Sequence, residues 1–152
     1  NEYKLINFQN FPRIIVWKFG LNFIKERPWI GWGAGSFYLL FKERGGNWNA
    51  QHLHNLPLDI SFKYGLIVSI TLTFIILMIL FKALRKILID DDNSLTIDKC
   101  WYASTLSILM FQINDTTYYD GKISIIMWIM LSGLKSIFDK KNYYLPKRTI
   151  IN

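Results

Sequence analysis

Two histidines and one arginine are the residues of this 152-residue chain whose types and spacing most clearly indicate chemistry. His52 and His54 are its only histidines, and both stand in the tetrapeptide His52-Leu53-His54-Asn55. An imidazole changes protonation near neutral pH, so it can take up or release a proton during a reaction. Arg13 stands among apolar residues, where a guanidinium is costly to bury unless it binds an anion such as phosphate. Together these residues predict proton transfer beside an anionic group.

Each of these residues also has a simpler interpretation. The arginine could extend its charged end to lipid headgroups, and either histidine could be an interfacial residue that is hydrogen-bonded to backbone. A His-x-His zinc site completed by Asp115 or Asp120 is another interpretation, but two histidines without a defined third ligand support it weakly. The single Cys100 excludes an internal disulfide and a cysteine-based zinc site. A metal site is therefore the weaker chemical interpretation of the two histidines, and we predict no cofactor.

A helix before the histidines is expected to present the arginine. Apolar residues of the segment Phe11–Ile24 cover much of a helical circumference, and Arg13 and Trp17 share one face because they are spaced i, i+4. Pro28 interrupts this pattern, and three glycines follow within residues 31–35. They predict a turn whose backbone amides can approach a ligand. Since no strand precedes these glycines, they do not form a dinucleotide-binding motif.

A second helix is expected directly after the histidines. Asn55 can cap this helix, and Pro57 is tolerated in its first turn. His54 then lies just ahead of a helix N-terminus, where the backbone amides attract a phosphate. If His52 continued the helical register, it would share a face with Asp59, whose carboxylate could orient the imidazole. The proline makes that pairing weak.

The second half of the chain is expected to lie in a membrane. Gly65–Phe81 is uncharged, and a basic cluster at residues 82–86 follows it, which by the positive-inside rule places residues 1–64 outside. Two shorter apolar runs would return the chain outward and then inward. We predict an all-α polytopic membrane protein with about three transmembrane helices, preceded by a helical, Gly/Trp-rich external loop segment. The predicted divisions are an external segment 1–64, a membrane region 65–138 with helices at about 65–84, 99–115 and 122–138, and a basic cytoplasmic tail 139–152.

The net charge of +7 is spread along the chain, with +4 in residues 1–64 and +3 in the remainder. A charge of this size and distribution is modest for a nucleic-acid-binding protein, so we predict no nucleic-acid partner. Basic residues placed in this way are more typical of membrane topology and of binding anionic lipid groups. The chain begins with Asn, and its first clear apolar run begins at residue 65. We therefore expect it to be the C-terminal part of a longer membrane protein.

Four short motifs in order resemble the O-antigen ligase/polymerase family of bacterial inner-membrane proteins. The resemblance covers roughly residues 12–80, and the stretches Asp115–Gly121 and Ile123–Leu134 resemble cyanobacterial members in particular. The motifs are Arg13-x-x-x-Trp17, Arg27-Pro28-Trp29-Ile30-Gly31-Trp32-Gly33-x-Gly35-x-Phe37, His52-x-His54-Asn55-x-Pro57-Leu58 and Tyr64-Gly65-Leu66-Ile67.

This resemblance implies a metal-independent glycosyltransferase of the GT-C type, acting in lipopolysaccharide or polysaccharide biosynthesis. The implied donor is a glycan linked to undecaprenyl diphosphate, and the implied acceptor is lipid A–core, a growing polysaccharide or a protein hydroxyl. The implied location is the bacterial inner membrane, with residues 1–64 on the periplasmic side and further N-terminal spans of the same protein as partners. By motif match the catalytic residues are His54, as base or orienter, and Arg13, at the diphosphate. The substrate-binding residues are His52, Asn55, Arg27 and Trp17.

Two alternatives to glycosyl transfer stay open from the sequence. A membrane transporter or transport-associated protein is one alternative, because some relatives of this kind are linked to inorganic-carbon uptake. A transporter would need ionisable residues in the centres of its spans, and the three apolar runs have essentially none there. An inactive, truncated fragment is the other alternative.

Overall fold

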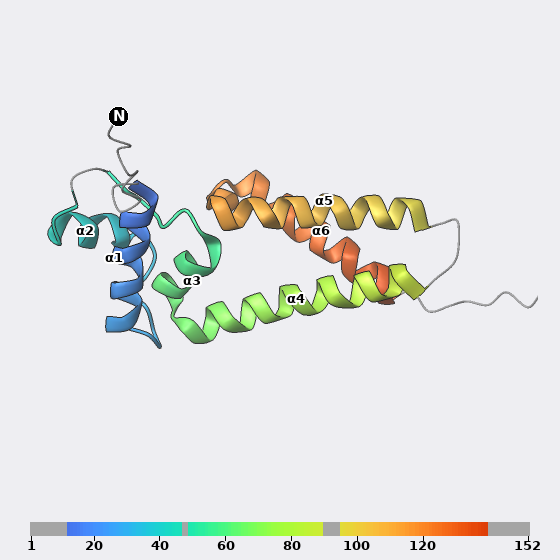
Figure 1. Cartoon of the computed structure of the whole chain (residues 1–152), viewed down its shortest axis with the longest axis horizontal. Helices are drawn as coiled ribbons and strands as arrows, with labels where there is room; N and C mark the ends of the chain where they lie inside the picture. The colour runs from blue at the N-terminus through green and yellow to red at the C-terminus, as the bar shows by residue number, and fades with distance from the viewer. Residues whose placement is uncertain (1–11, 47–48, 90–94, 140–152) are drawn as a thin grey trace, which may run out of the picture.

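The prediction of an all-α fold is confirmed. The computed structural model describes residues 12–46, 49–89 and 95–139, and every regular element within these ranges is helical. Figure 1 shows the order of the elements along the chain. They are α1 (Pro12–Glu26), α2 (Ser36–Glu43), α3 (Leu56–Tyr64), α4 (Leu66–Ile89), α5 (Leu95–Asn114), the short 3-10 helix η2 (Thr117–Tyr119) and α6 (Gly121–Asp139).

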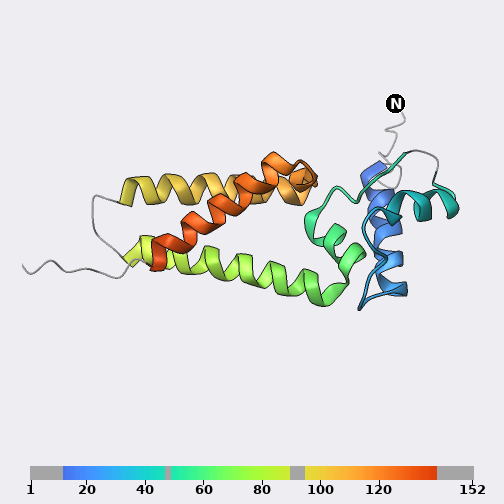
Figure 2. The ribbon, with the colours of Figure 1, turned by 180° about the vertical axis from the view of Figure 1, so that it is seen from behind.

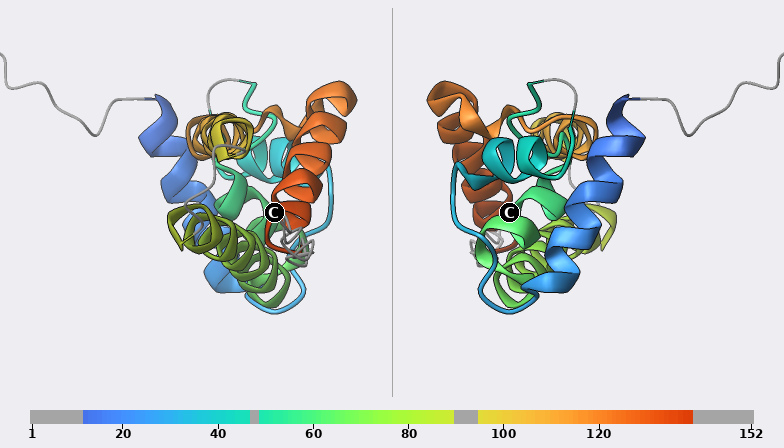
Figure 3. Two further views of the ribbon diagram at one scale, coloured as in Figure 1. Left: turned by 90° about the vertical axis from the view of Figure 1, so that its right-hand side faces the viewer. Right: turned by 90° about the vertical axis from the view of Figure 1, so that its left-hand side faces the viewer.

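The molecule is elongated, with a small helical head at one end of three long helices. Helices α1, α2 and α3 form the head, and α4, α5 and α6 extend from it (Figures 1 and 2). Seen along the long axis, the three long helices are arranged as a triangle rather than a layer (Figure 3). The connection between α5 and α6 lies at the head end, so residues from the far half of the sequence come next to the head.

Aromatic side chains form the core of the head. Phe23 of α1, Phe37 and Phe41 of α2, and Phe62 of α3 are all almost completely buried. The rings of Phe37 and Phe62 meet edge to face with centroids 5.3 Å apart, and those of Phe23 and Phe62 are tilted with centroids 5.9 Å apart. Burying one such ring contributes about 1.5–3 kcal/mol. This core fixes α3, and therefore the turn before it, against α1 and α2.

Two of the long helices, α4 and α6, are long and apolar enough to cross a membrane. Only 17 % of the apolar window of α4 and 22 % of that of α6 are buried, whereas the core helix of a soluble protein would be mostly buried. Large side chains such as Ile70, Phe74 and Trp128 are exposed on them. The chain is therefore an all-α protein with membrane-type helices. The predicted crossing by three helices stays a prediction, as does the direction in which each one crosses.

The helix bounds differ from the predicted segments by a few residues. α1 continues to Glu26, beyond the predicted end at Ile24, and α4 continues to Ile89, beyond the predicted end at residue 84. α5 begins at Leu95 rather than at residue 99. The first residue of the predicted outer helix, Phe11, and the predicted tail beyond residue 139 lie outside the described residues.

Candidate functional site

The glycine-rich turn packs against the end of α3. The Trp32 N–H donates to the carbonyl of Phe62 (2.8 Å), and the Gly33 N–H donates to the carbonyl of Lys63 (3.0 Å). Gly31 has φ +74, and a Cβ there would collide with the Lys63 carbonyl. Only glycine adopts this conformation without strain and allows this close approach. The prediction that these amides approach a ligand is wrong for residues 32 and 33, because α3 already occupies them.

Trp17 holds the turn His52–Asn55, called the histidine turn below, against α1. Its indole N–H donates to the carbonyl of Leu53, which lies between the two histidines, at 2.8 Å. Trp32 makes a similar bond to the carbonyl of Phe23 near the end of α1, also at 2.8 Å. The exposed guanidinium of Arg27 lies over the Trp32 ring, 4.1 Å from its centroid. Trp17 thus supports the site through the backbone, and the geometry brings Arg27 to a tryptophan rather than to a histidine.

Asn55 joins α3 to the end of α5. Its side-chain oxygen accepts from the backbone N–H of Leu58 at 3.1 Å, which confirms the predicted helix cap. Its side-chain nitrogen donates to the carbonyl of Ile113 at 2.9 Å. One side chain therefore fixes the end of the histidine turn to both the head and the long helices.

His54 pairs with Asp115, a residue 61 positions further along the chain. Its Nδ1 lies 2.9 Å from the Asp115 Oδ1. Because a carboxylate only accepts, Nδ1 carries the proton and donates it, and Nε2 of the neutral ring then remains a proton acceptor. The His54 backbone has φ 50, and it is the only non-glycine residue with positive φ among the described residues. Backbone strain of this kind concentrates at functional sites.

Asp115 stays ionised in this pair. The hydrogen bond from His54 lowers the pKa of its carboxyl group most, and the backbone N–H of Thr116, donating at 2.8 Å, lowers it further. The positive charge of Arg13, whose side chain is exposed, also lowers this pKa, with the smallest effect of the named groups. Both Arg13 and His54 thus favour the charged form of Asp115, His54 through a hydrogen bond and Arg13 through its charge alone.

His52 lies between His54 and Tyr119 of η2. Its ring centroid is 4.6 Å from that of His54 and 4.9 Å from that of Tyr119. Burial lowers the pKa of His52 most, and the nearby charge of His54 lowers it further. His52 is therefore neutral at pH 7, and it packs against the ring that bears the proton-accepting nitrogen.

These groups are also spaced as metal ligands would be. One donor atom each from His52, His54 and Asp115 lie within 4.8 Å of one another, so these three residues could hold a cation. Asp120, the other carboxylate considered from the sequence, instead caps α6 by accepting from the N–H of Lys122 at 2.8 Å. Since the Asp115 oxygen already accepts from His54 and Thr116, hydrogen bonds alone account for the arrangement.

The sequence did not identify Asp115 as the partner of His54. From the sequence, Asp115 is a candidate turn residue, catalytic residue or zinc ligand, and Asp59 is the candidate carboxylate that orients His52. Asp59 instead accepts hydrogen bonds from the backbone N–H of Leu53 (3.3 Å) and from the side chains of Lys63, Tyr118 and Tyr119. The one usable signal is the predicted topology, in which the turn after the second span lies on the same side of the membrane as the histidines.

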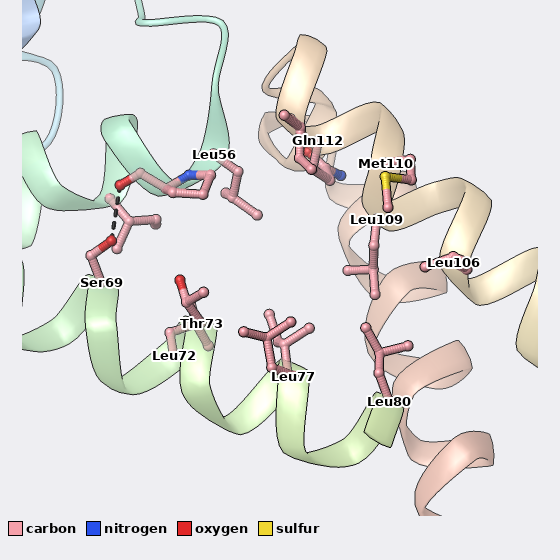
Figure 4. A pocket seen from close by; sticks show the side chains of 14 residues that line it. Leu56, Ser69, Leu72, Thr73, Leu77, Leu80, Leu106, Leu109, Met110 and Gln112 are labelled. Carbon is pink, nitrogen blue, oxygen red and sulfur yellow. Dashed lines mark hydrogen bonds between the residues drawn. The ribbon is translucent and has the colours of Figure 1, made fainter. Parts of the chain in front are cut away.

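An apolar cavity of about 150 Å³ opens next to this polar cluster. It lies between α3, α4 and α5, and Figure 4 shows its side chains approaching from all three helices. Leu56, Pro57 and Ile113 line it, and these residues directly follow or bond to Asn55. The arrangement therefore joins a polar, charged end to an apolar end, as an amphiphilic ligand requires.

Stability is expected to fall on acidification through His52. Its folded pKa lies below the 6.5 of the unfolded chain, so as the pH falls below 6.5 the unfolded state takes up the proton first. The contribution of His52 to stability is thus present above pH 6.5 and is lost between that value and its lower folded pKa. Thermal unfolding of the detergent-solubilised chain between about pH 7.5 and 5 would measure this. His52→Gln should flatten the decline in Tm, and an equally steep decline would contradict the assignment.

Comparison with known proteins gives one match. Residues 6–73 match the profile of the protein family described as O-Antigen ligase. No curated protein and no solved structure matches the chain. The matched residues include α1, the glycine-rich turn, both histidines and the start of α4, whereas Asp115 lies beyond them.

Proposed function

We propose that the chain takes part in moving a glycan from undecaprenyl diphosphate to an acceptor hydroxyl, because residues 6–73 match the O-antigen ligase family. The observation that carries this proposal is the His54–Asp115 pair, which leaves one ring nitrogen free to accept a proton. The proposed place is the outer face of the bacterial inner membrane, with residues 1–64 periplasmic and α4, α5 and α6 spanning. Lipid A–core, polysaccharide and protein hydroxyls are the candidate acceptors.

The proposed reaction is a single displacement at the anomeric carbon. The acceptor oxygen forms a bond to that carbon while the bond from the carbon to the diphosphate oxygen breaks, and its electron pair leaves with the diphosphate. Nε2 of His54 takes the proton of the acceptor hydroxyl, and the carboxylate of Asp115 stabilises the imidazolium that results. This division of roles requires no metal.

Arg13 is proposed to bind the diphosphate. Its guanidinium is exposed on α1, and its charge reaches Asp115 next to His54. A planar guanidinium suits phosphate oxygens, and positive charge near the leaving group stabilises the charge that develops there. His52 and Asn55 would support the site by packing against His54 and by fixing the turn, and Trp17 by bonding Leu53.

The apolar cavity between α3, α4 and α5 is proposed to receive the lipid end of the donor (Figure 4). Leu72, Leu77 and Leu109 are among its apolar side chains. A cavity of this volume accepts a molecule such as benzene, so it has room for about one isoprene unit. A polyprenyl chain bound in this cavity would place its diphosphate at the turn that carries His54.

The test is a transfer assay on membranes from a host whose own copy of the gene is deleted and then restored. With a polyprenyl-diphosphate-linked oligosaccharide, restored membranes should glycosylate the acceptor and release polyprenyl diphosphate, with and without a metal chelator. A polyprenyl-monophosphate donor should be used poorly. Arg13→Gln should raise the KM for the diphosphate donor about tenfold or more, because one charged hydrogen-bonding group is lost.

Lys18→Gln is the matched control, since it removes an exposed positive charge from the same helix. Its KM should remain that of the unaltered protein. Equal use of both donors, or equal KM values for the two variants, would refute the role of Arg13. Equal transfer by deleted and restored membranes would refute the proposed function itself.

A further inference from the structure

Asp59 is a completely buried carboxylate with four hydrogen-bond donors around it. Its Oδ2 accepts from Lys63 at 2.6 Å, from the Tyr118 hydroxyl at 2.8 Å and from the Tyr119 hydroxyl at 2.7 Å. Its Oδ1 accepts from the backbone N–H of Leu53 at 3.3 Å. A buried charge is tolerated only when it is paired and hydrogen-bonded, and here both oxygens are satisfied.

These donors come from separate parts of the chain. Leu53 belongs to the histidine turn, and Lys63 lies one helical turn after Asp59 on α3. Both tyrosines belong to η2, between α5 and α6. Burial raises the pKa of the Tyr118 hydroxyl, and the nearby charge of Asp59 adds to this, so Tyr118 keeps its proton and remains a donor. Lys63 also lies 3.9 Å from the centre of the Tyr119 ring. One carboxylate thus fastens the η2 turn to α3.

The connection between α5 and α6, which contains η2, also carries Asp115, the partner of His54. Asp115 precedes η2 by two residues, and its oxygen contacts His54 at 2.9 Å. The Tyr119 ring, at the end of η2, packs against His52, which packs against His54. Fixing η2 therefore fixes both the Asp115 carboxylate that contacts His54 and the Tyr119 ring that contacts His52.

We propose that Asp59 is a positioning residue for His54, which it aligns by clamping the η2 turn and the histidine turn to α3. Asp59 contacts neither the donor nor the acceptor, and it acts through Leu53, Tyr118 and Tyr119. The effect on transfer rests on the proposed function, whereas the effect on the His54 ring does not.

The two histidines allow this to be tested directly in the protein. Ring-¹⁵N-labelled histidine gives signals from His52 and His54 alone, since the chain has no others. In the chain reconstituted in lipid nanodiscs, His54 should be protonated on Nδ1, as its bond to Asp115 requires. The His54 signal is assigned by its loss in His54→Gln.

Asp59→Asn should disturb this tautomer. An asparagine has one acceptor oxygen, so it can serve either the Leu53 N–H or the three donors at Oδ2, but not both. The Nδ1-protonated signal of His54 should weaken, and kcat should fall about 10²-fold with little change in KM, as expected for a misplaced catalytic group. Tyr119→Phe should lower kcat about tenfold, because one hydrogen bond is lost.

Two further variants keep the outcome decisive. If Asp59→Asn does not fold, Asp59→Asn/Lys63→Met removes the unpaired charge and is judged by the same two readouts, together with Tyr119→Phe. Tyr38→Phe, an exposed tyrosine on α2, is the control and should leave both readouts unchanged.

Folded variants that keep the His54 signal and kcat of the unaltered protein would overturn the proposal. A shifted tautomer with unaltered transfer would support positioning by Asp59 but refute His54 as the group that acts in transfer.

Discussion

Replacing His54 with glutamine is expected to lower kcat for glycan transfer by about 10²–10⁴-fold, the usual contribution of a positioned general base. Glutamine can still offer a hydrogen bond to Asp115, but its neutral amide does not take up the proton of the acceptor hydroxyl. Binding of the donor should change little, because Arg13 and the apolar cavity are unaltered. The measurement is transfer from the diphosphate donor by membranes that hold equal amounts of each protein.

A second substitution separates loss of the base from damage to the turn. The backbone φ of 50 at His54 is one that glycine adopts without strain, so His54→Gly should fold at least as readily. It leaves a space next to Asp115 in which free imidazole can bind. Added imidazole should restore part of the transfer rate to His54→Gly and none to His54→Gln. Transfer at the unaltered rate in both variants would exclude His54 from the chemistry.

Asp115→Asn is expected to lower kcat about 10²-fold. The carboxylate accepts the Nδ1 proton of His54, whereas the asparagine amide can present its own N–H there and so stabilise the ring with its proton on Nε2. That tautomer cannot accept a proton from the acceptor hydroxyl. The same exchange at a buried catalytic aspartate costs about 10⁴-fold, and the loss should be smaller here because Asp115 is 46 % exposed.

The matched control for this variant lies in the same connection. Asp120 caps α6 by accepting from the backbone N–H of Lys122, and asparagine is an equally good cap, so Asp120→Asn should transfer at the unaltered rate. The ring-¹⁵N spectrum of Asp115→Asn should show His54 protonated on Nε2. A kcat equal to that of Asp120→Asn would show that Asp115 has no part in transfer.

The local features of the chain could be predicted because they depend on residues close together in sequence. The cap at Asn55 needs only the backbone N–H three residues later, and the apolar run beginning at Gly65 indicates a long helix by composition alone. The motifs within residues 6–73 likewise carried the family resemblance, which the profile match confirms for those residues. The roles of Arg13 and His54 in transfer stay predictions.

The partners within the site were decided by tertiary structure. The bonds of His54 to Asp115 and of Asp59 to Tyr118 and Tyr119 each join positions about sixty residues apart. No spacing or periodicity encodes such pairs, because they depend on where the α5–α6 connection meets the head. The glycine-rich turn is a further example: the sequence predicts a turn from its glycines, but the backbone contacts of this turn with α3 are known only from the structure. Sequence alone determined the helices and the residues able to do chemistry, whereas packing determined which carboxylate orients the histidine and which one holds the turn.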